Sequence, residues 1–338
     1  MQNRRHFLTT GLSMAAAGLA GAAALTGARR SVAEEAPPET TALRLATSPA
    51  TCLAPLDILD DLVRDEGFAE VHYVRGESSA SEIVARGEAD FGQDFSGGTI
   101  ALIDAAVPMV MLAGVHLGCF ELFARESIRS VVELKGNKVG VLGTAVGTAD
   151  YEIVSIVAAS VGLNPTKDIN WVAHGPRDPK ELFADGEIDA FLAWPPLSQE
   201  LRARNLGRVI LSSVVDRPWS QYFCCMLMGA SDFVRRNPIA TKRVVRAMLR
   251  ATDICAAKPD WVAQRLVDRG FTSRYDYARQ GLSDIDYRSW REYDAEDSIR
   301  FYALRLRELN MIKSSPDKII AQGTDWRFIK EVRKELGI

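Results

Sequence analysis

Short strand-like segments alternate with helix-like segments from residue 43 to about residue 228, and this alternation limits the fold more than any other feature. Apolar runs of strand length are separated by amphipathic stretches that stop at glycine or proline. Such alternation is typical of strands joined by helices that cover a mostly parallel sheet. The predicted strands are residues 43–46, 71–74, 89–92, 109–115, 120–124, 138–142, 170–172, 190–192 and 224–228.

Beyond residue 230 the pattern becomes mostly helical, with helices predicted at 238–257, 298–309 and 327–336. In the first of these, an apolar stripe through Val245 and Met248 is predicted to face the interior. The basic residues predicted to face water are Lys242, Arg243, Arg246 and Arg250. The expected fold class is therefore α/β, with parallel-biased sheets and a helical C-terminal section.

The first 33 residues have the pattern of a twin-arginine export signal. Arg4 and Arg5 precede Phe-Leu, an uncharged Ala- and Gly-rich stretch covers 12–26, and a small-residue cleavage site ends at Ala33. Alanine and glycine contribute little transfer free energy, so this stretch is a weak membrane span. We expect export to the periplasm with cleavage after Ala33, followed by a polar linker at 34–41. An uncleaved membrane anchor is the alternative.

Charge argues against a nucleic-acid partner. Residues 1–33 contain four arginines and no acidic residue, so 37 of the 41 basic residues remain in the exported part, against 44 acidic residues. A mildly acidic surface does not attract a phosphate backbone. No second apolar stretch reaches the length of a membrane span, so contact with the membrane is expected only through a partner protein.

The five cysteines do not form a recognisable metal motif. Their number is odd, no CxxC pair occurs, and the three histidines after residue 33 lie far apart in the sequence. We therefore expect buried free thiols, no metal and no cofactor. Cys224 and Cys225 are adjacent in a predicted strand, where successive side chains point to opposite faces.

Four stretches of the sequence occur in a characteristic order and with a characteristic spacing. They are a Gly-x-x-Asp-Phe-Gly strand at 87–92, a Leu-Lys-Gly segment at 130–141, a small-residue loop at 143–148, and a Phe…Asn-Pro segment starting at 233. Together they resemble the SsuA/THI5-like, or NMT1-like, group of periplasmic substrate-binding proteins from nitrate-, sulfonate- and taurine-type ABC transporters. The same group contains thiamine-pyrimidine synthesis proteins.

The resemblance implies a type II periplasmic-binding-protein fold with two lobes, each a mostly parallel sheet flanked by helices. Lobe one is expected at 42–126 and 223–338, and lobe two at 127–222. Such proteins clasp a small-molecule ligand in the cleft between the lobes. They deliver it to an ABC permease with a cytoplasmic ATPase, and we expect a monomer.

Three loops that follow strands are expected to line the cleft. The first contains Ser48 and Cys52. The second precedes a helix, where Ser96 and Gly97 are expected to contact the ligand, Phe95 to stack on it, and Asp94 either to contact it or to cap the helix. In the third, a helix start suits a bound anion; its candidates are Thr144, Ala145 and Gly147.

Three further candidates lie near the crossings between lobes. Trp194 offers a stacking surface or a core side chain, His116 either a ligand contact or a structural hydrogen bond, and Tyr222 a ring with a polar hydroxyl. These aromatic faces favour a small planar or aromatic acid, a sulfonate or a related anion.

No nucleophile motif such as GxSxG occurs, and together with the export signal and the family resemblance this favours a binding protein over an enzyme. One alternative is an enzyme similar to the thiamine-pyrimidine synthases that uses a metal at Cys224 and Cys225, or a pyrimidine-precursor binder of the same family. Another is a periplasmic ligand sensor that reports to a membrane receptor.

Overall fold

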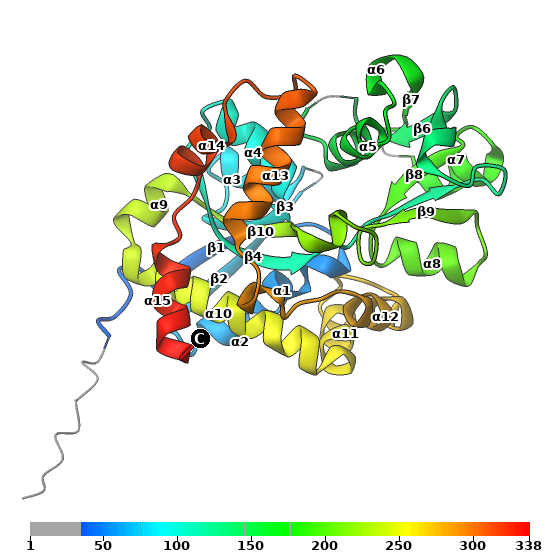
Figure 1. Ribbon diagram of the computed structural model, residues 1–338. Coiled ribbons are helices and arrows are strands. Elements are labelled where there is room, and N and C mark those ends of the chain that lie inside the picture. The colour runs from blue at the N-terminus through cyan, green and yellow to red at the C-terminus, as the bar shows by residue number, and fades with distance from the viewer. Residues whose placement is uncertain (1–34, 77, 145, 176) are drawn as a thin grey trace, which may run out of the picture. The chain divides into compact units, whose positions relative to one another are not determined.

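Two five-stranded sheets organise the fold (Figure 1). The computed structural model describes residues 35–338 except 77, 145 and 176, so the predicted signal segment 1–33 and the candidate Ala145 lie outside the described residues. The strand order is β2–β1–β3–β10–β4 in the first sheet and β7–β6–β8–β5–β9 in the second. The strands are β1 Ala42–Thr47, β2 Glu70–Arg75, β3 Phe91–Phe95, β4 Met109–Leu117, β5 Glu121–Ala124, β6 Lys138–Val141, β7 Asn170–Ala173, β8 Ala190–Ala193, β9 Arg208–Ser212 and β10 Phe223–Ala230.

Each sheet has a parallel part and one reversed strand. β2, β1 and β3 are parallel in the first sheet, and β7, β6 and β8 are parallel in the second. β10 and β5 each run antiparallel to both of their neighbours. These reversed strands are the first that the chain forms after each crossing between the sheets. The α/β class with two sheet-based lobes is confirmed.

The first crossing comes earlier than the sequence predicts. β5 belongs to the second sheet, so the expected lobe-one segment 42–126 is too long at its end. The chain crosses at 118–120 without an intervening helix, and for this reason the sequence prediction places the strand after the link in the first lobe. Gly118 fits there because a Cβ would lie 2.0 Å from the carbonyl oxygen of Ser213. The return meets the first sheet at Phe223, where β10 begins.

Helices cover both sheets, and a helical section follows β10. The helices before β5 are η1 Thr51–Leu53, α1 Ala54–Asp57, α2 Leu59–Val63, α3 Ala80–Ala85 and α4 Ser96–Asp104. Those from β5 to β10 are η2 Val131–Leu134, α5 Ala149–Ser160, α6 Pro165–Asp168, α7 Pro179–Asp185, α8 Leu197–Ala203 and η3 Trp219–Gln221. The C-terminal section contains α9 Ser231–Arg236, α10 Pro238–Ala257, α11 Pro259–Asp268, α12 Tyr275–Asp284, η4 Ser289–Arg291, α13 Ala295–Glu308, α14 Pro316–Gly323 and α15 Arg327–Leu336. Within the described part of the chain, every helix is too short or too polar to span a membrane.

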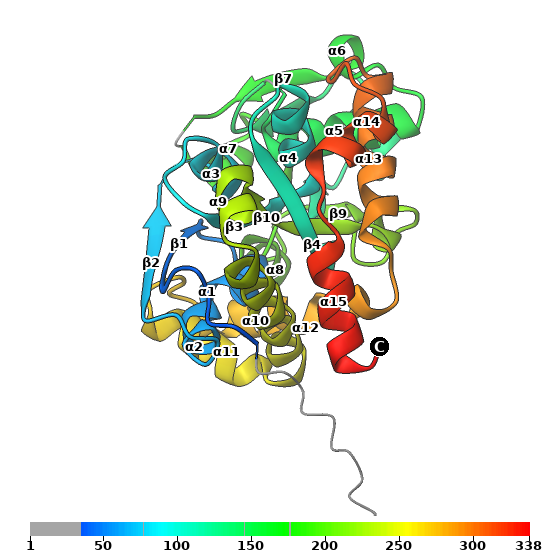
Figure 2. The same cartoon turned by 90° about the vertical axis from the view of Figure 1, so that its left-hand side faces the viewer.

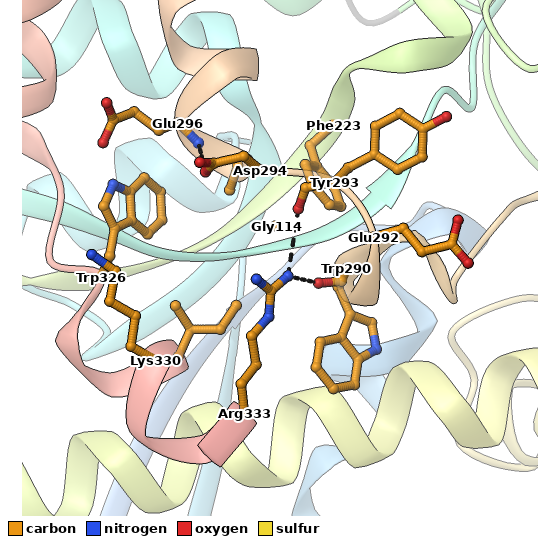
Figure 3. Close-up of a pocket in the computed structure, with 12 residues that line it drawn as sticks. Gly114, Phe223, Trp290, Glu292, Tyr293, Asp294, Glu296, Trp326, Lys330 and Arg333 are labelled. Atoms are coloured by element: carbon orange, nitrogen blue, oxygen red, sulfur yellow. Dashed lines mark hydrogen bonds between the residues drawn. The ribbon is translucent and has the colours of Figure 1, made fainter. Parts of the chain in front are cut away.

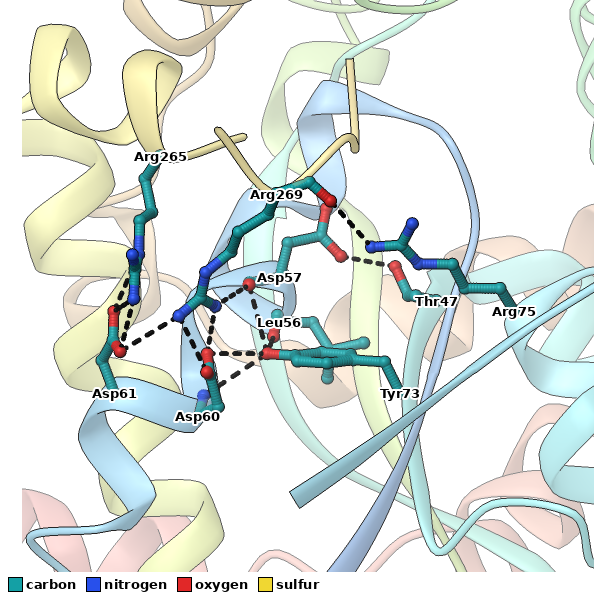
Figure 4. Close-up of polar contacts among 9 residues, drawn as sticks. All are labelled: Thr47, Leu56, Asp57, Asp60, Asp61, Tyr73, Arg75, Arg265 and Arg269. Carbon is teal, nitrogen blue, oxygen red and sulfur yellow. Dashed lines mark hydrogen bonds and ion pairs between the residues drawn. The ribbon is translucent and has the colours of Figure 1, made fainter. Parts of the chain in front are cut away.

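A polar network fastens the C-terminal section to the first lobe (Figure 4). Arg269, at the end of α11, pairs with Asp60 and Asp61 on α2, and Arg265 reaches Asp61 at 2.8 Å. Tyr73 on β2 donates to the carbonyl of Leu56 at 3.0 Å, which joins the sheet to the same network. The C-terminal helices are therefore part of the first lobe.

The polar side of α10 is not a simple solvent face, which corrects the sequence prediction. Lys242, Arg243 and Arg246 are half-buried, and only Arg250 of the predicted set is exposed. The cause is that α10 packs between α2 and α15, as Figure 2 shows. Arg246 and Arg250 both pair with the buried carboxylate of Glu66.

Candidate ligand cleft

A cavity of about 330 Å³ opens where the carboxyl ends of strands from both sheets meet. Ligands in open α/β sheets bind at such strand ends. Loops and helices of both lobes line it. The described lining residues are Ser48, Pro49, Ala50, Cys52, Leu53, Ser78, Ser79, Glu82, Asp94, Phe95, Cys119, Phe120, Leu142, Gly147, Thr148, Ala149, Asp150, Ile153, Trp194, Cys224 and Cys225.

The first lobe contributes the start of α3 to this cavity. Ser79 and Glu82 form a capping box, in which each side chain bonds the backbone amide of the other residue. Asp94 accepts hydrogen bonds from the amide and the hydroxyl of Ser81, at 2.9 and 2.8 Å. Asp94 therefore steadies α3 and does not cap α4, whose first residue is Ser96. Burial raises the pKa of Asp94 above its ordinary value.

The second lobe contributes the start of α5. Asp150 accepts hydrogen bonds from the amides of Leu142 and Tyr151, and burial raises its pKa. The buried Glu152 accepts a bond from the Gly147 amide at 2.8 Å through Oε1, while Oε2 has no hydrogen-bond partner. Burial raises the pKa of Glu152 to about 8. The backbone amides of Gly147 and Tyr151 at the start of α5 therefore already donate hydrogen bonds to carboxyl oxygens of the protein itself.

Thiols form the floor of the cavity. Cys52 lies on η1, Cys119 follows β4, and Cys224 and Cys225 lie on β10. The sequence predicts that the side chains of Cys224 and Cys225 point to opposite faces of the sheet, but in the structure both line the cavity. The register between β10 and β4 shifts on both sides of Cys225, as at a β-bulge. The sulfurs of Cys119 and Cys224 lie 3.3 Å apart.

The packed thiols shift one another's ionisation. Hydrogen bonds from Cys119, and next from Cys225, hold the pKa of Cys52 and of Cys224 well below the ordinary thiol value. The contact with Cys224 is the main cause that raises the pKa of Cys119, and the contact with Cys119 is the main cause that raises the pKa of Cys225. Burial acts to lower the pKa of His116, but the sulfurs of Cys52 and Cys224 and the Leu117 carbonyl together outweigh it, and the net pKa is raised.

The structure divides the residues that the sequence singled out. Those that line the cavity are Ser48, Cys52, Asp94, Phe95, Gly147 and Trp194. Those described but outside its lining are Ser96, Gly97, His116, Thr144 and Tyr222. Ala145 lies outside the described residues.

Residues outside the lining have other contacts. The hydroxyl of Ser96 donates to the carbonyls of Phe223 and Cys224, at 2.9 and 3.0 Å. Tyr222 stacks on Phe301, with ring centroids 3.9 Å apart. Gly97 permits close packing, because a Cβ there would lie 2.9 Å from Glu152 Oε2. These contacts hold the lobes and strands in place.

Sequence reasoning missed several lining residues. The Ser-x-x-Glu spacing of Ser79 and Glu82 is a visible helix-start signal and could have placed them at a strand end facing the cleft. Cys119 and Phe120 follow His116 in the sequence, but their position depends on the early crossing. Nothing local to the sequence shows that Cys52, Cys119 and Cys225 meet, because strand order brings them together.

A second cavity, of about 200 Å³, lies between the C-terminal section and strands β4 and β10 (Figure 3). Arg333 on α15 crosses it and donates to the carbonyls of Trp290 and Tyr293. Its described lining comes from the first lobe alone, so it offers no contact to the second lobe. We take the first cavity as the candidate site because both lobes line it and it lies at the carboxyl ends of their strands.

Solved structures share the fold. The periplasmic nitrate-binding protein NrtA from Synechocystis PCC 6803 superposes with a TM-score of 0.77 at 15% identity, over 89% of this chain and 90% of that one. The alkanesulfonate-binding protein SsuA from Xanthomonas axonopodis pv. citri, bound to MOPS, gives a TM-score of 0.67 at 14% identity, over 82% of this chain and 96% of that one. At such identities the likeness concerns the fold.

Sequence comparison points the same way. A curated binding protein of Brucella abortus is 27% identical over 139 residues, which are 41% of this chain and 42% of that protein. This chain therefore matches less than half the length of that relative. The profile of the NMT1-like family matches residues 36–266, more than half of the chain. The chain belongs to the NMT1-like family.

Proposed function

We propose that this protein is the extracytoplasmic solute-binding subunit of an ABC importer. It captures a small organic ligand between its lobes and delivers it to a membrane permease with a cytoplasmic ATPase. The observation that carries this proposal is the cavity of about 330 Å³ lined by both lobes. Its volume is at the small end of ligand sites, which range from about 300 to 1,000 Å³.

Closure of the lobes is the mechanism that this arrangement supports. The chain crosses between the sheets at 118–120 and returns to β10 at Phe223, so two short links join the lobes. A ligand that contacts Phe95 in one lobe and Trp194 beside the other stabilises the closed form, because opening breaks one set of contacts. The permease then recognises the closed form.

The composition of the lining supports a ligand with a planar face. Phe95, Phe120 and Trp194 give aromatic faces, which suit a small planar molecule. The described lining contains no lysine or arginine but three carboxylates, from Glu82, Asp94 and Asp150. If the ligand is a carboxylate or a sulfonate, its negative charge must therefore be balanced by a group other than a lysine or arginine of the described lining.

Export through the twin-arginine pathway, cleavage after Ala33 and a monomeric state in the periplasm complete the proposal. The structurally similar NrtA is a periplasmic binding protein, and the sequence pattern at Arg4 and Arg5 supports the route. Mass spectrometry of the exported protein should show Glu34 as the first residue. An intact Met1 on exported protein would contradict cleavage.

A thermal-shift screen tests the binding function. The panel pairs aromatic carboxylates and sulfonates with neutral molecules of the same shape, and we expect at least one to raise Tm by several degrees. Trp194→Ala should weaken that ligand about tenfold or more. Trp261→Ala, a half-exposed tryptophan on α11 away from the cavity, is the matched control and should leave affinity unchanged. The proposal would be overturned if no compound of the panel raised Tm and the protein converted one of them into a product.

A further inference from the structure

Four side chains from three separate parts of the sequence converge beneath the cleft. They are Cys52 on η1, His116 near the end of β4, Cys119 just after β4, and Cys225 on β10. One ligand atom from each lies within 4.8 Å of the others, and all four side chains are buried. Three sulfurs and one imidazole nitrogen at this spacing can surround a single metal ion, since Zn–S and Zn–N bonds measure about 2.3 and 2.0 Å.

His116 has the hydrogen-bonding pattern of a metal ligand. Its Nδ1 lies 2.7 Å from the carbonyl oxygen of Leu117, and because a carbonyl only accepts, Nδ1 carries the hydrogen. Nε2 is fully buried without a hydrogen-bond partner. An unpartnered buried polar atom is costly. Metal-binding histidines commonly donate their other ring nitrogen to a carbonyl in this way.

The backbone around Cys52 is also held in place. Its carbonyl oxygen accepts hydrogen bonds from Gln93 Nε2 at 3.0 Å and from the Tyr287 hydroxyl at 3.3 Å. The Tyr287 ring packs edge-on against His116, with centroids 5.5 Å apart. One tyrosine from the C-terminal section thus positions two of the four candidate ligands, as outer-shell residues do at metal sites.

A disulfide is the main competing use of these thiols. Cys119 and Cys224 are neighbours, but their sulfurs lie 3.3 Å apart, whereas a disulfide bond measures about 2.05 Å. All five cysteines are free in the structure. The thiols are therefore available as ligands.

We infer that Cys52, His116, Cys119 and Cys225 bind one zinc ion at the floor of the cleft. Three cysteines and one histidine form a common zinc ligand set, and soft thiolates also accept Cu(I). Charge decides between the two ions. Three thiolates and a neutral imidazole carry one net negative charge around Zn²⁺ but two around Cu(I), and buried net charge is costly.

This site goes beyond the proposed function and does not depend on it. Cys52, Cys119 and Cys225 also line the cavity, so the ion would face any ligand held there. The described lining lacks lysine and arginine, and the ion would offset two of the three thiolate charges at the floor of the cavity. The twin-arginine route, which exports folded chains, would let the ion bind before export.

Metal analysis of the full exported protein, purified under reducing conditions without added metal, tests the site. We expect about one zinc per chain by mass spectrometry, loss on chelation, and recovery of Tm when Zn²⁺ is returned. Cys119→Ser and His116→Gln should each lower zinc affinity at least tenfold. Cys255→Ala, at a buried cysteine on α10 outside the four, is the matched control and should keep its zinc.

Cobalt substitution keeps the test valid if a variant misfolds. Co²⁺ added to the chelated wild type should give thiolate-to-cobalt charge-transfer absorption, and Zn²⁺ should displace it. Three results would overturn the inference: stoichiometric copper or iron in place of zinc, a Cys119–Cys224 disulfide in reduced preparations, or no charge-transfer band. A protein that binds an organic ligand but no zinc or cobalt overturns the metal site alone. A zinc-loaded protein that binds no ligand overturns only the proposed function.

Discussion

Arg202 on α8 pairs with Asp284 at the end of α12, so a helix of the second lobe is joined to the C-terminal section of the first. Arg202 also pairs with Glu121 on β5 at 2.7 Å, which fixes its guanidinium from its own lobe. Gln199 adds a hydrogen bond to the same Asp284 oxygen at 3.1 Å. An ion pair and a hydrogen bond thus hold the two lobes together at this point.

Asp284→Asn should loosen this contact. We expect about 1 kcal/mol lower unfolding free energy and a larger radius of gyration by small-angle X-ray scattering, because the open form gains population. Asp253→Asn is the control, since Asp253 pairs with Arg291 within one lobe at similar exposure. It should lose similar stability without change in size. Identical scattering from both variants would contradict a role in closure.

Glu152 should make stability fall as pH rises. Its pKa is raised from the ordinary 4.5 to about 8, so the folded protein binds this proton more tightly than the unfolded chain. The stabilisation is complete below about pH 4.5 and is lost as pH rises through about 8. Relative to Glu152→Gln, the wild type should lose a few kcal/mol over that interval, since one pKa unit is about 1.4 kcal/mol.

Thermal unfolding of both proteins across this pH range is the measurement. The control is Glu181→Gln, at an exposed position on α7 in the same lobe, which should follow the wild-type curve. Parallel wild-type and Glu152→Gln curves would show that Glu152 titrates normally. The carboxyl faces Gly97 at the start of α4, so its ionisation also bears on contact between the lobes.

The sequence predicts those parts of the fold that have local signals. α10 matches its predicted bounds because Pro238 starts it and Pro259 follows its end. α13 begins at Ala295, three residues before the predicted start, because Asp294 caps it. The crossing at 118–120 has no turn signal except Gly118, whose need for space depends on Ser213, about 95 residues later. Contacts of that range leave no local pattern.

The candidate site shows the same division. Ser48 and Trp194 follow strands and Phe95 ends one, and ligand sites form at the carboxyl ends of parallel strands, so their place in the cavity follows from topology. The convergence of Cys52 with Cys119 and Cys225 depends on strand order and on the register shift in β10. Neither the strand order nor the register shift can be predicted from a single sequence. For that reason the sequence showed no metal motif, although the fold brings these residues together.

Gly118→Ala should be strongly destabilising. The added Cβ would meet the backbone of Ser213 at 2.0 Å, and backbone atoms at a lobe crossing have little room to move. We expect at least about 2 kcal/mol lower unfolding free energy in urea, as for other overpacked positions. Gly76→Ala is the control, because its nearest neighbour would lie 3.6 Å away. Equal midpoints for the two variants would show that the crossing adapts.

Two glutamates pair with arginines of α10, and Glu66 should stabilise the packing of this helix more than Glu335 does. The carboxylate of Glu66 is 6% exposed and pairs with Arg246 and Arg250, whereas Glu335, also paired with Arg246, is 40% exposed. Glu66→Gln removes the buried negative charge beside Arg246, which is itself 13% exposed, whereas Glu335→Gln removes a charge that is largely in contact with solvent. We expect about 2 kcal/mol lower unfolding free energy for Glu66→Gln and less than about 1 kcal/mol for Glu335→Gln. Added salt should reduce the second effect more than the first, because exposed pairs are screened. Equal losses with equal salt dependence would show that burial of Glu66 does not strengthen its ion pairs.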